Sequence, residues 1–367
     1  LTSQSAEGKR LFGTVLTDQD NSVSSAVSDW LQAAQCHFMR RLGEYDEART
    51  QLEALIARLL SASIDGTAAA KSRIADQDKL LAAQAYIFAS CVLGWVNYEQ
   101  GKYESAQHYF FTAHAQAERV NDRIHLMEAH NGLGAVAFSE KRYASARVQY
   151  EAALMHAKQQ ADLHYTAIIL GNLAAHAQIT GAFSEAERYL QKRLEIDEKT
   201  QNMRQMAISY QRLGQLALVG DTYTKTESYL RQSLDYFRQL GNSPETAHVL
   251  LDLSQSLLCQ RRIKEAEEQC LYSLQLAMQA QMTPRILAAL ALLAEIRIAE
   301  EKKEDAFLLL QMVDRNTQLP AATWQRAQKL QNTLIAELGE SAITPIRQAL
   351  AGQSLQEFGT HLLMLGH

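Results

Sequence analysis

The sequence predicts an all-α helical solenoid, because three observations indicate one helix-turn-helix unit repeated along the chain. A leucine recurs with a period of 40 residues at Leu93, Leu133, Leu173, Leu213, Leu253 and Leu293. A small residue follows each leucine, and twelve positions later a second small column appears, with one threonine in it. The 367 residues contain only 4 prolines and 17 glycines, so little interrupts a helix. A fixed period of this length is typical of stacked units that each contact only their neighbours.

Composition and charge argue against several classes of protein. The formal net charge of −5 is mild and no basic stripe is present, so we expect no direct binding of nucleic acid. The four cysteines form no CxxC pair, which favours a reduced, cytoplasmic protein. We find no signal peptide and no stretch with the length and purity of a membrane span, so we expect no membrane contact. The first residue is Leu1, which favours a fragment of a longer protein.

Residues 124–162 serve as the type unit. One face of its first helix carries Leu126, Ala129, Leu133, Val136 and Ala137. After a polar turn, the second helix carries Tyr143, Ala146, Tyr150, Ala153 and Leu154. We expect Gly134 and Ala146 to lie where the two helices cross, since small residues let backbones approach closely. We expect the ring at the position of Tyr143 to supply the main apolar mass of each unit.

Three segments precede the regular array. Residues 1–22 are expected to be weakly ordered. Residues 23–60 form the predicted first repeat, with a helix over residues 25–41. Its turn glycine, Gly43, lies more than one repeat period before the next turn glycine, Gly101. The extra residues predict an insertion over 61–80, as a loop or a lengthened helix end.

Six regular 40-residue repeats are predicted over 81–320, followed by a degenerate capping repeat over 321–367. In that cap we expect a helix over 324–338, Pro345 in the first turn of another helix, and an amphipathic segment over 355–365. Terminal repeats drift from the pattern because one side faces solvent. Together these segments predict one solenoid domain over 1–367 with about seven to eight repeats.

These columns resemble the tetratricopeptide repeat. The segment from Leu93 through Gly101 to Ala113 matches the pattern of that family at every main position, and the segments beginning at Leu133 and Leu173 match it nearly as well. The usual unit has about 34 residues, whereas this one has a longer second helix and no closing proline. The resemblance implies a right-handed superhelix whose first helices line a concave groove.

The groove positions of the first helices combine aromatic residues with adaptable amides, which suits a peptide or a small organic ligand. The predicted binding residues are Phe88, Trp95, Tyr98, Asn131, Phe138, Gln178, Gln211, Gln215 and Gln255. The alternative is that these side chains only pack between adjacent first helices. The groove positions carry no lysine or arginine that matches those of chaperone-binding repeats, so capture of a carboxylate is not expected.

The chain offers no catalytic constellation, so we expect a non-enzymatic protein without a cofactor. His125, Glu128 and His130 invite a zinc interpretation, but two histidines five residues apart do not share a helix face. We therefore predict no metal site. The cysteines lack an adjacent resolving partner and are expected to be buried structural thiols.

The uninterrupted 40-residue period and the Ala- and Gln-rich units are similar to the C-terminal sensor arms of bacterial STAND regulators, including relatives of the maltose-responsive activator. The resemblance covers about residues 25–350. It implies a sensor that binds a peptide, protein or small-molecule inducer, while a separate ATPase module drives signal transduction and transcription regulation. One alternative is a stand-alone adaptor, since kinesin light chains and polarity adaptors use similar long repeats. Another is a non-catalytic region attached to a protease or phosphatase.

Overall fold

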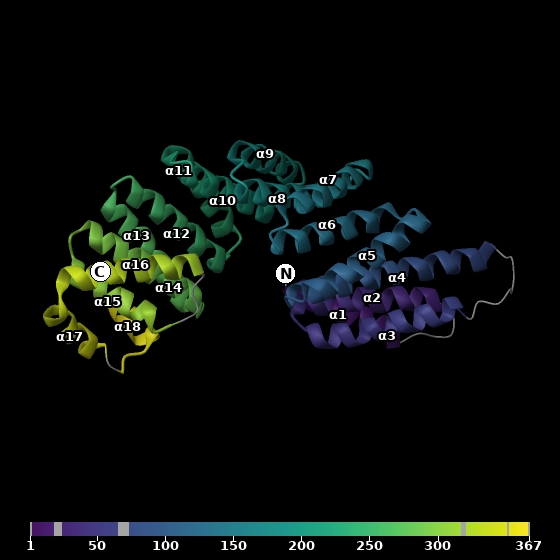
Figure 1. The fold of residues 1–367 in the computed structure, drawn as a ribbon, viewed down its shortest axis with the longest axis horizontal. Coiled ribbons are helices and arrows are strands. Elements are labelled where there is room, and N and C mark those ends of the chain that lie inside the picture. The colour runs from purple at the N-terminus through teal and green to yellow at the C-terminus, as the bar shows by residue number, and fades with distance from the viewer. Residues whose placement is uncertain (1, 18–23, 65–72, 317–320, 351, 366–367) are drawn as a thin grey trace. The chain divides into compact units, whose positions relative to one another are not determined.

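The computed structural model describes residues 2–17, 24–64, 73–316, 321–350 and 352–365. Over these ranges the chain forms 18 helices and no strand, which confirms the predicted all-α class (Figure 1). Internal contacts divide it into two compact units, Leu1–Tyr189 and Leu190–His367, and each is described by itself. The single domain predicted over 1–367 stays a prediction.

The two units contain the same kind of helix. The first unit contains α1 (Thr2–Thr17), α2 (Ser25–Leu42), α3 (Tyr45–Ile64), α4 (Arg73–Glu99), α5 (Tyr103–Val120), α6 (Arg123–Ser139), α7 (Tyr143–Gln159) and α8 (Leu163–Ile179). The unit boundary falls inside α9 (Phe183–Lys199). The second unit contains α10 (Met203–Val219), α11 (Tyr223–Gln239), α12 (Ser243–Cys259), α13 (Ile263–Gln279), α14 (Thr283–Ala299), α15 (Lys303–Asp314), α16 (Ala321–Leu338), α17 (Glu340–Ala349) and α18 (Leu355–Leu365).

The helices from α6 to α14 are all equal in length, and each is joined to the next by a turn of three residues. The middle residue of each turn is left-handed, with φ between 51° and 78°. This conformation recurs at half the repeat period, at Gly101, Asn121, Lys141, Ala161, Gly181, Gln201, Asp221, Gly241, Arg261, Gln281 and Glu301. Its N–H bonds the last helical turn, as when Lys141 N donates to Phe138 O at 3.0 Å. The same turn therefore occurs inside each helix-turn-helix repeat and between one repeat and the next, even where its middle residue is not glycine.

The start of the first helix in four repeats is capped by an acidic or amide side chain. Asp122, Asp162, Asn202 and Asn242 each accept a hydrogen bond from the backbone N–H three residues later. These side chains satisfy donors that the helix leaves unpaired. The caps thus reinforce the repeat period.

The expected close helix crossing is confirmed at Gly134. A Cβ there would lie 2.6 Å from Cδ1 of Tyr150, and one at Gly94 would lie 2.7 Å from Cε1 of Phe110. The rings of Phe110 and Tyr150 are fully buried, whereas Tyr143 is only half-buried. The main apolar mass therefore lies sixteen residues after the small column, and the prediction that placed it at Tyr143 is wrong.

The N-terminal segment corrects a further expectation. The sequence predicts weak order over residues 1–22, but Thr2–Thr17 form α1, which packs on α2. Phe12 stacks on Phe38 with ring centroids 5.5 Å apart, and Lys9 pairs with Glu44 at 2.6 Å. Aromatic stacking and an ion pair thus hold α1 against α2 and the turn that follows it.

The helices at the two ends of the regular array differ in part from the boundaries predicted from the sequence. Of the insertion predicted over 61–80, residues 65–72 lie outside the described residues, and the flanking parts lengthen α3 and α4. Pro345 lies inside α17, because that helix already begins after Gly339, whose φ is 74°. The prediction of Pro345 in a first turn is therefore wrong. Helix α18 packs on α13, where a Cβ at Gly359 would meet Met278 at 2.5 Å.

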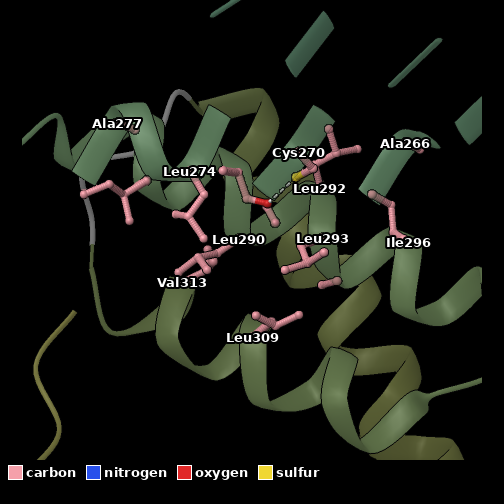
Figure 2. Close-up of a cluster of buried hydrophobic side chains, with 14 of the residues drawn as sticks. Ala266, Cys270, Leu274, Ala277, Leu290, Leu292, Leu293, Ile296, Leu309 and Val313 are labelled. Carbon is pink, nitrogen blue, oxygen red and sulfur yellow. Dashed lines mark hydrogen bonds between the residues drawn. The ribbon is translucent and has the colours of Figure 1, made fainter. Parts of the chain in front are cut away.

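The second unit has one continuous apolar core that runs from α10 to α18. Figure 2 shows part of it, where Leu290 and Leu293 of α14 face Leu309 and Val313 of α15. The thiol of Cys270 donates to the carbonyl of Ala289 at 3.3 Å and is buried. Burial raises its pKa to about 12, in agreement with the predicted buried structural thiol. Cys36 and Cys91 are also buried, but Cys259 is exposed, so the prediction that the cysteines are buried is wrong for Cys259.

The prediction that no stretch has the length of a membrane span is wrong for α4. By length and composition alone, Gln77–Glu99 could cross a membrane, and 56% of its most apolar window is buried inside the unit. Ile87, Val92 and Leu93 of this stretch are fully buried against neighbouring helices. Core packing thus uses the apolar side chains that make the stretch resemble a span.

The left-handed turn predicts opposite effects for two substitutions. We expect Ala161→Gly to raise the free energy of unfolding by up to about 1 kcal/mol, because glycine has no Cβ penalty at φ 51°. Gly181→Ala, at φ 78°, should lower it by a similar amount. Urea unfolding followed by circular dichroism measures both. The control Ala152→Gly, inside α7, should be destabilising, and a stabilising result there would refute the conformational explanation.

Candidate functional site

An open pocket of about 910 Å³ lies in the second unit. Its walls come from α10, α12, α14 and α16 and from the turn before α14. The lining residues are Leu218, His248, Leu251, Asp252, Gln255, Gln281, Met282, Thr283, Pro284, Arg285, Ala288, Ala291, Leu292, Glu295, Thr323, Arg326 and Ala327.

The pocket arises from a change of side-chain size along the repeat. His248 and Leu251 occupy two groove positions of α12, and the same positions of α14, one repeat period later, are Ala288 and Ala291. Each replacement removes several heavy atoms from one wall while the backbone spacing is kept. Apolar side chains, such as that of Leu292, line the pocket that this leaves. The pocket thus forms within the regular array, between its helices and the short turn before α14.

Asp252 is the polar centre of this pocket. Nε2 of Gln211 donates to its Oδ2 at 3.1 Å, and Nε2 of Gln215 donates to the same oxygen at 2.9 Å. The carboxylate is half-buried, and burial raises its pKa against the opposing influence of His248, the two amides and Arg285. Burial lowers the pKa of His248, so its imidazole is neutral near pH 7.

Two arginines reach the rim, each with a carboxylate partner. Arg285 lies 3.8 Å from Glu245, and Arg326 forms a close ion pair with Glu295. Glu295 keeps only 13% of its side chain exposed, and burial raises its pKa to about 7 in spite of Arg326. The sequence analysis predicted no arginine at the groove positions of the first helices. Arg285 and Arg326 do not occupy those positions, since Arg285 lies at the start of α14 and Arg326 lies on the capping helix α16.

One predicted residue lines this pocket, and two others bond one of its lining residues. Gln211 and Gln215 contact it through Asp252, and Gln255 lines it directly, with Nε2 3.9 Å from Sγ of Cys259. Asp252 is a site residue that sequence reasoning missed. The available signal was its column, since Asp252 is the one carboxylate among the six residues that directly precede the repeat leucines.

The predicted aromatic residues of the first unit belong to separate packing groups. Trp95 lies 5.1 Å from Phe110 and 5.6 Å from Tyr98, between ring centroids. Phe138 lies against Tyr143, 5.7 Å away. Phe88 stacks on Trp30 at 5.7 Å. The packing alternative therefore describes these contacts, and a binding role stays a prediction.

The polar residues predicted in the first unit differ in exposure. Asn131 is buried and accepts a hydrogen bond from Nδ2 of Asn172 at 2.8 Å. Gln178 is exposed. The indole of Trp95 also bonds Glu128, whose pKa is raised by burial. These bonds join predicted groove residues to neighbouring side chains, whereas Gln178 faces solvent.

The residues of the zinc interpretation have separate partners. Nδ1 of His125 lies 2.7 Å from Asp122, and Nδ1 of His130 lies 2.8 Å from Gln149. His130 also contacts His114 and His156, with ring centroids 4.6 and 5.6 Å away. Among the described residues, no three His, Cys, Asp or Glu side chains are arranged to hold a metal ion.

Glu295 predicts a dependence of stability on pH. The folded chain keeps a proton on Glu295 up to about pH 7, whereas the unfolded chain releases it near the ordinary value of 4.5. The free energy of unfolding should therefore fall as pH rises through this window. Glu295→Gln should remove that slope and be more stable by about 2–3 kcal/mol at pH 8. Urea unfolding between pH 4 and 8 checks this, and the exposed Glu268→Gln should keep the slope.

The packing of Trp95 predicts a structural cost for its removal. Trp95→Ala should lower the free energy of unfolding by roughly 2–4 kcal/mol, because it empties the space against Phe110. Phe111→Ala is the control in the same unit, since that ring is 52% exposed. Thermal unfolding compares the two variants. Equal effects would show that Trp95 does not contribute through packing.

The comparisons with known proteins agree with this geometry. Residues 125–199 match the family model described as tetratricopeptide repeat. No curated protein sequence matches the chain. A signal transduction ATPase with numerous domains (STAND) protein with a tetratricopeptide repeat sensor, from Pyrococcus horikoshii, aligns with a TM-score of 0.61 at 14% identity. The alignment covers 98% of this chain and 52% of that chain, about half of its length.

Two further solved structures align over nearly their whole length. A Rap protein complexed with Competence and Sporulation Factor has a TM-score of 0.58 at 14% identity, covering 96% of this chain and 95% of that chain. Aspartyl phosphate phosphatase F from Bacillus subtilis has a TM-score of 0.57 at 13% identity, covering 92% and 97%. At such identities the likeness shows the fold. The family match thus identifies tetratricopeptide repeats over residues 125–199, and the chain shares its fold with a protein that has a tetratricopeptide repeat sensor.

Proposed function

We propose that this chain is a non-catalytic binding array whose second-unit pocket receives an extended peptide segment of a partner protein or a small-molecule inducer. The pocket itself carries the proposal. Its volume of about 910 Å³ suits a small ligand or a few peptide residues. Apolar walls from Leu218, Leu251 and Leu292 surround a few fixed polar groups, which is the usual composition of a binding site.

The polar groups of the pocket favour recognition over chemistry. Asp252 is held by Gln211 and Gln215, so its carboxylate is oriented before any ligand arrives. Fixed side chains lose little conformational freedom on binding. Gln255 and the rim arginines add further hydrogen-bonding groups. No nucleophile with an adjacent base is among the lining residues.

The first unit is proposed as a second contact surface for the same partner. Of its predicted residues, Gln178 is exposed, and Phe88, Trp95, Tyr98 and Phe138 are half-buried. Half-buried rings keep part of their faces accessible to a partner while neighbours hold them in place. Asn131, which is buried, would act by holding Asn172.

We further propose that the chain is the sensor domain of a bacterial, cytoplasmic signal-transduction ATPase or transcription regulator. The support is its resemblance to STAND sensor arms and its shared fold with a STAND protein that has a tetratricopeptide repeat sensor. The coding sequence upstream of Leu1 tests this. A phosphate-loop motif in the same reading frame would support the sensor, and a start codon directly before Leu1 would contradict it.

A stand-alone adaptor is the second candidate. The observation that favours it is the length of two matches, since the Rap protein and phosphatase F align over 95% and 97% of their chains. A free-standing array of this length therefore exists as a folded protein. Such an adaptor would use the same pocket without an attached ATPase.

Filling the pocket tests the binding function. Ala288→Trp places an indole in the hollow, so we expect the purified chain to capture its partner or inducer from native lysate at least about tenfold less well. Mass spectrometry of co-eluting proteins and small molecules provides the measurement. Ala299→Trp, an exposed site on the same helix, is the matched control. Equal capture by both variants would refute a binding role for this pocket.

A further inference from the structure

The charges of the pocket leave one carboxylate without a cationic partner. Arg285 pairs with Glu245, and Arg326 pairs with Glu295. In the part of the chain that the structure describes, Asp252 forms no ion pair, and its two hydrogen-bond donors are neutral amides. Asp252 is therefore the lining carboxylate that has hydrogen-bond partners but no cationic partner within ion-pair distance.

The two amides also leave one oxygen of Asp252 available. Both glutamines donate to Oδ2, and no described residue donates a hydrogen bond to Oδ1. A half-buried carboxylate that lacks full compensation costs free energy, and an approaching cation with N–H donors relieves that cost. His248 does not serve this purpose, since burial favours its neutral form. The site is therefore incomplete in charge and in hydrogen bonds.

Building on the proposed function, we propose that this pocket binds an ammonium or guanidinium group, with Oδ1 of Asp252 as its main acceptor. The apolar walls formed by Leu218, Leu251 and Leu292 pack against the aliphatic stem that carries such a group. Glu295 supplies a second carboxylate. Its partner Arg326 has 56% of its side chain exposed, so it can move aside toward solvent.

The group has two chemical sources, which are a lysine or arginine side chain of a peptide and a free polyamine. A phage-displayed random heptapeptide library, panned against the whole chain, tests the first source. We expect the selected peptides to be enriched in lysine or arginine at one recurring position. Their affinity should fall roughly tenfold or more with Asp252→Asn, which keeps the size of the side chain and removes its charge.

Control variants separate binding from folding. Asp235→Asn, an exposed change on α11, should leave the affinity unchanged. Glu295→Gln should cause a smaller loss than Asp252→Asn, because Glu295 is only partly ionised near pH 7 and already pairs with Arg326. Thermal unfolding of each variant shows that the array is intact. Affinity for the selected peptides should also fall as salt concentration rises.

The outcomes distinguish this inference from the proposed function. Peptides that bind and are lost on Ala288→Trp, but show no basic enrichment or no response to Asp252→Asn, would overturn cation recognition and leave the pocket as a binding site. Peptides that bind equally to Ala288→Trp would overturn the binding function itself. Calorimetry with spermidine tests the second source. If spermidine binds more tightly than the selected peptides and Asp252→Asn abolishes that binding, cation recognition is supported and its ligand is a small amine.

Discussion

The three-residue turn that ends each helix is the constraint on which the array depends. Its middle residue is left-handed twice in every repeat, whether it is a glycine, an alanine or an arginine. The helices from α6 to α14 are also equal in length. Residues one repeat period apart therefore occupy equivalent positions on their helices. The left-handed conformation costs free energy at the non-glycine residues Lys141, Ala161 and Arg261, yet it is kept because it preserves the turn between successive helices. Hydrogen bonds to the preceding helix offset that penalty.

Because the helices and turns repeat, differences in side-chain size between repeats determine where the helices meet closely and where a space remains. Where Gly94 and Gly134 remove a side chain, Phe110 and Tyr150 fill the space and the helices meet closely. Where Ala288 and Ala291 remove bulk on the groove side, no larger residue fills the space and a pocket opens. The same physical change therefore produces a tight helix crossing at Gly94 and Gly134 and an open pocket at Ala288 and Ala291.

The pocket also shows how a repeat protein can place charge in a partly dry environment. Asp252 is tolerated because two glutamines from the preceding first helix donate to it. Glu295 is tolerated because it holds a proton over part of the pH range and pairs with Arg326. Such groups weaken the fold when they lack partners, because a buried charge without compensation costs free energy.

The repeat register was sufficient to predict the helices, the close crossing at Gly134 and the location of Gln211, Gln215 and Gln255 at one polar surface, since those depend on sequence spacing alone. Register could not predict that two of these amides converge on Asp252, because that contact depends on how far one first helix lies from the next. It also could not predict α1, which is held by Phe38, nor Arg326, which comes from the capping helix. The sequence by itself determined the repeated unit, because period and local propensity are properties of the chain. Only the tertiary structure decided which side chains share a pocket and which carboxylate is left uncompensated, because those depend on distances between helices.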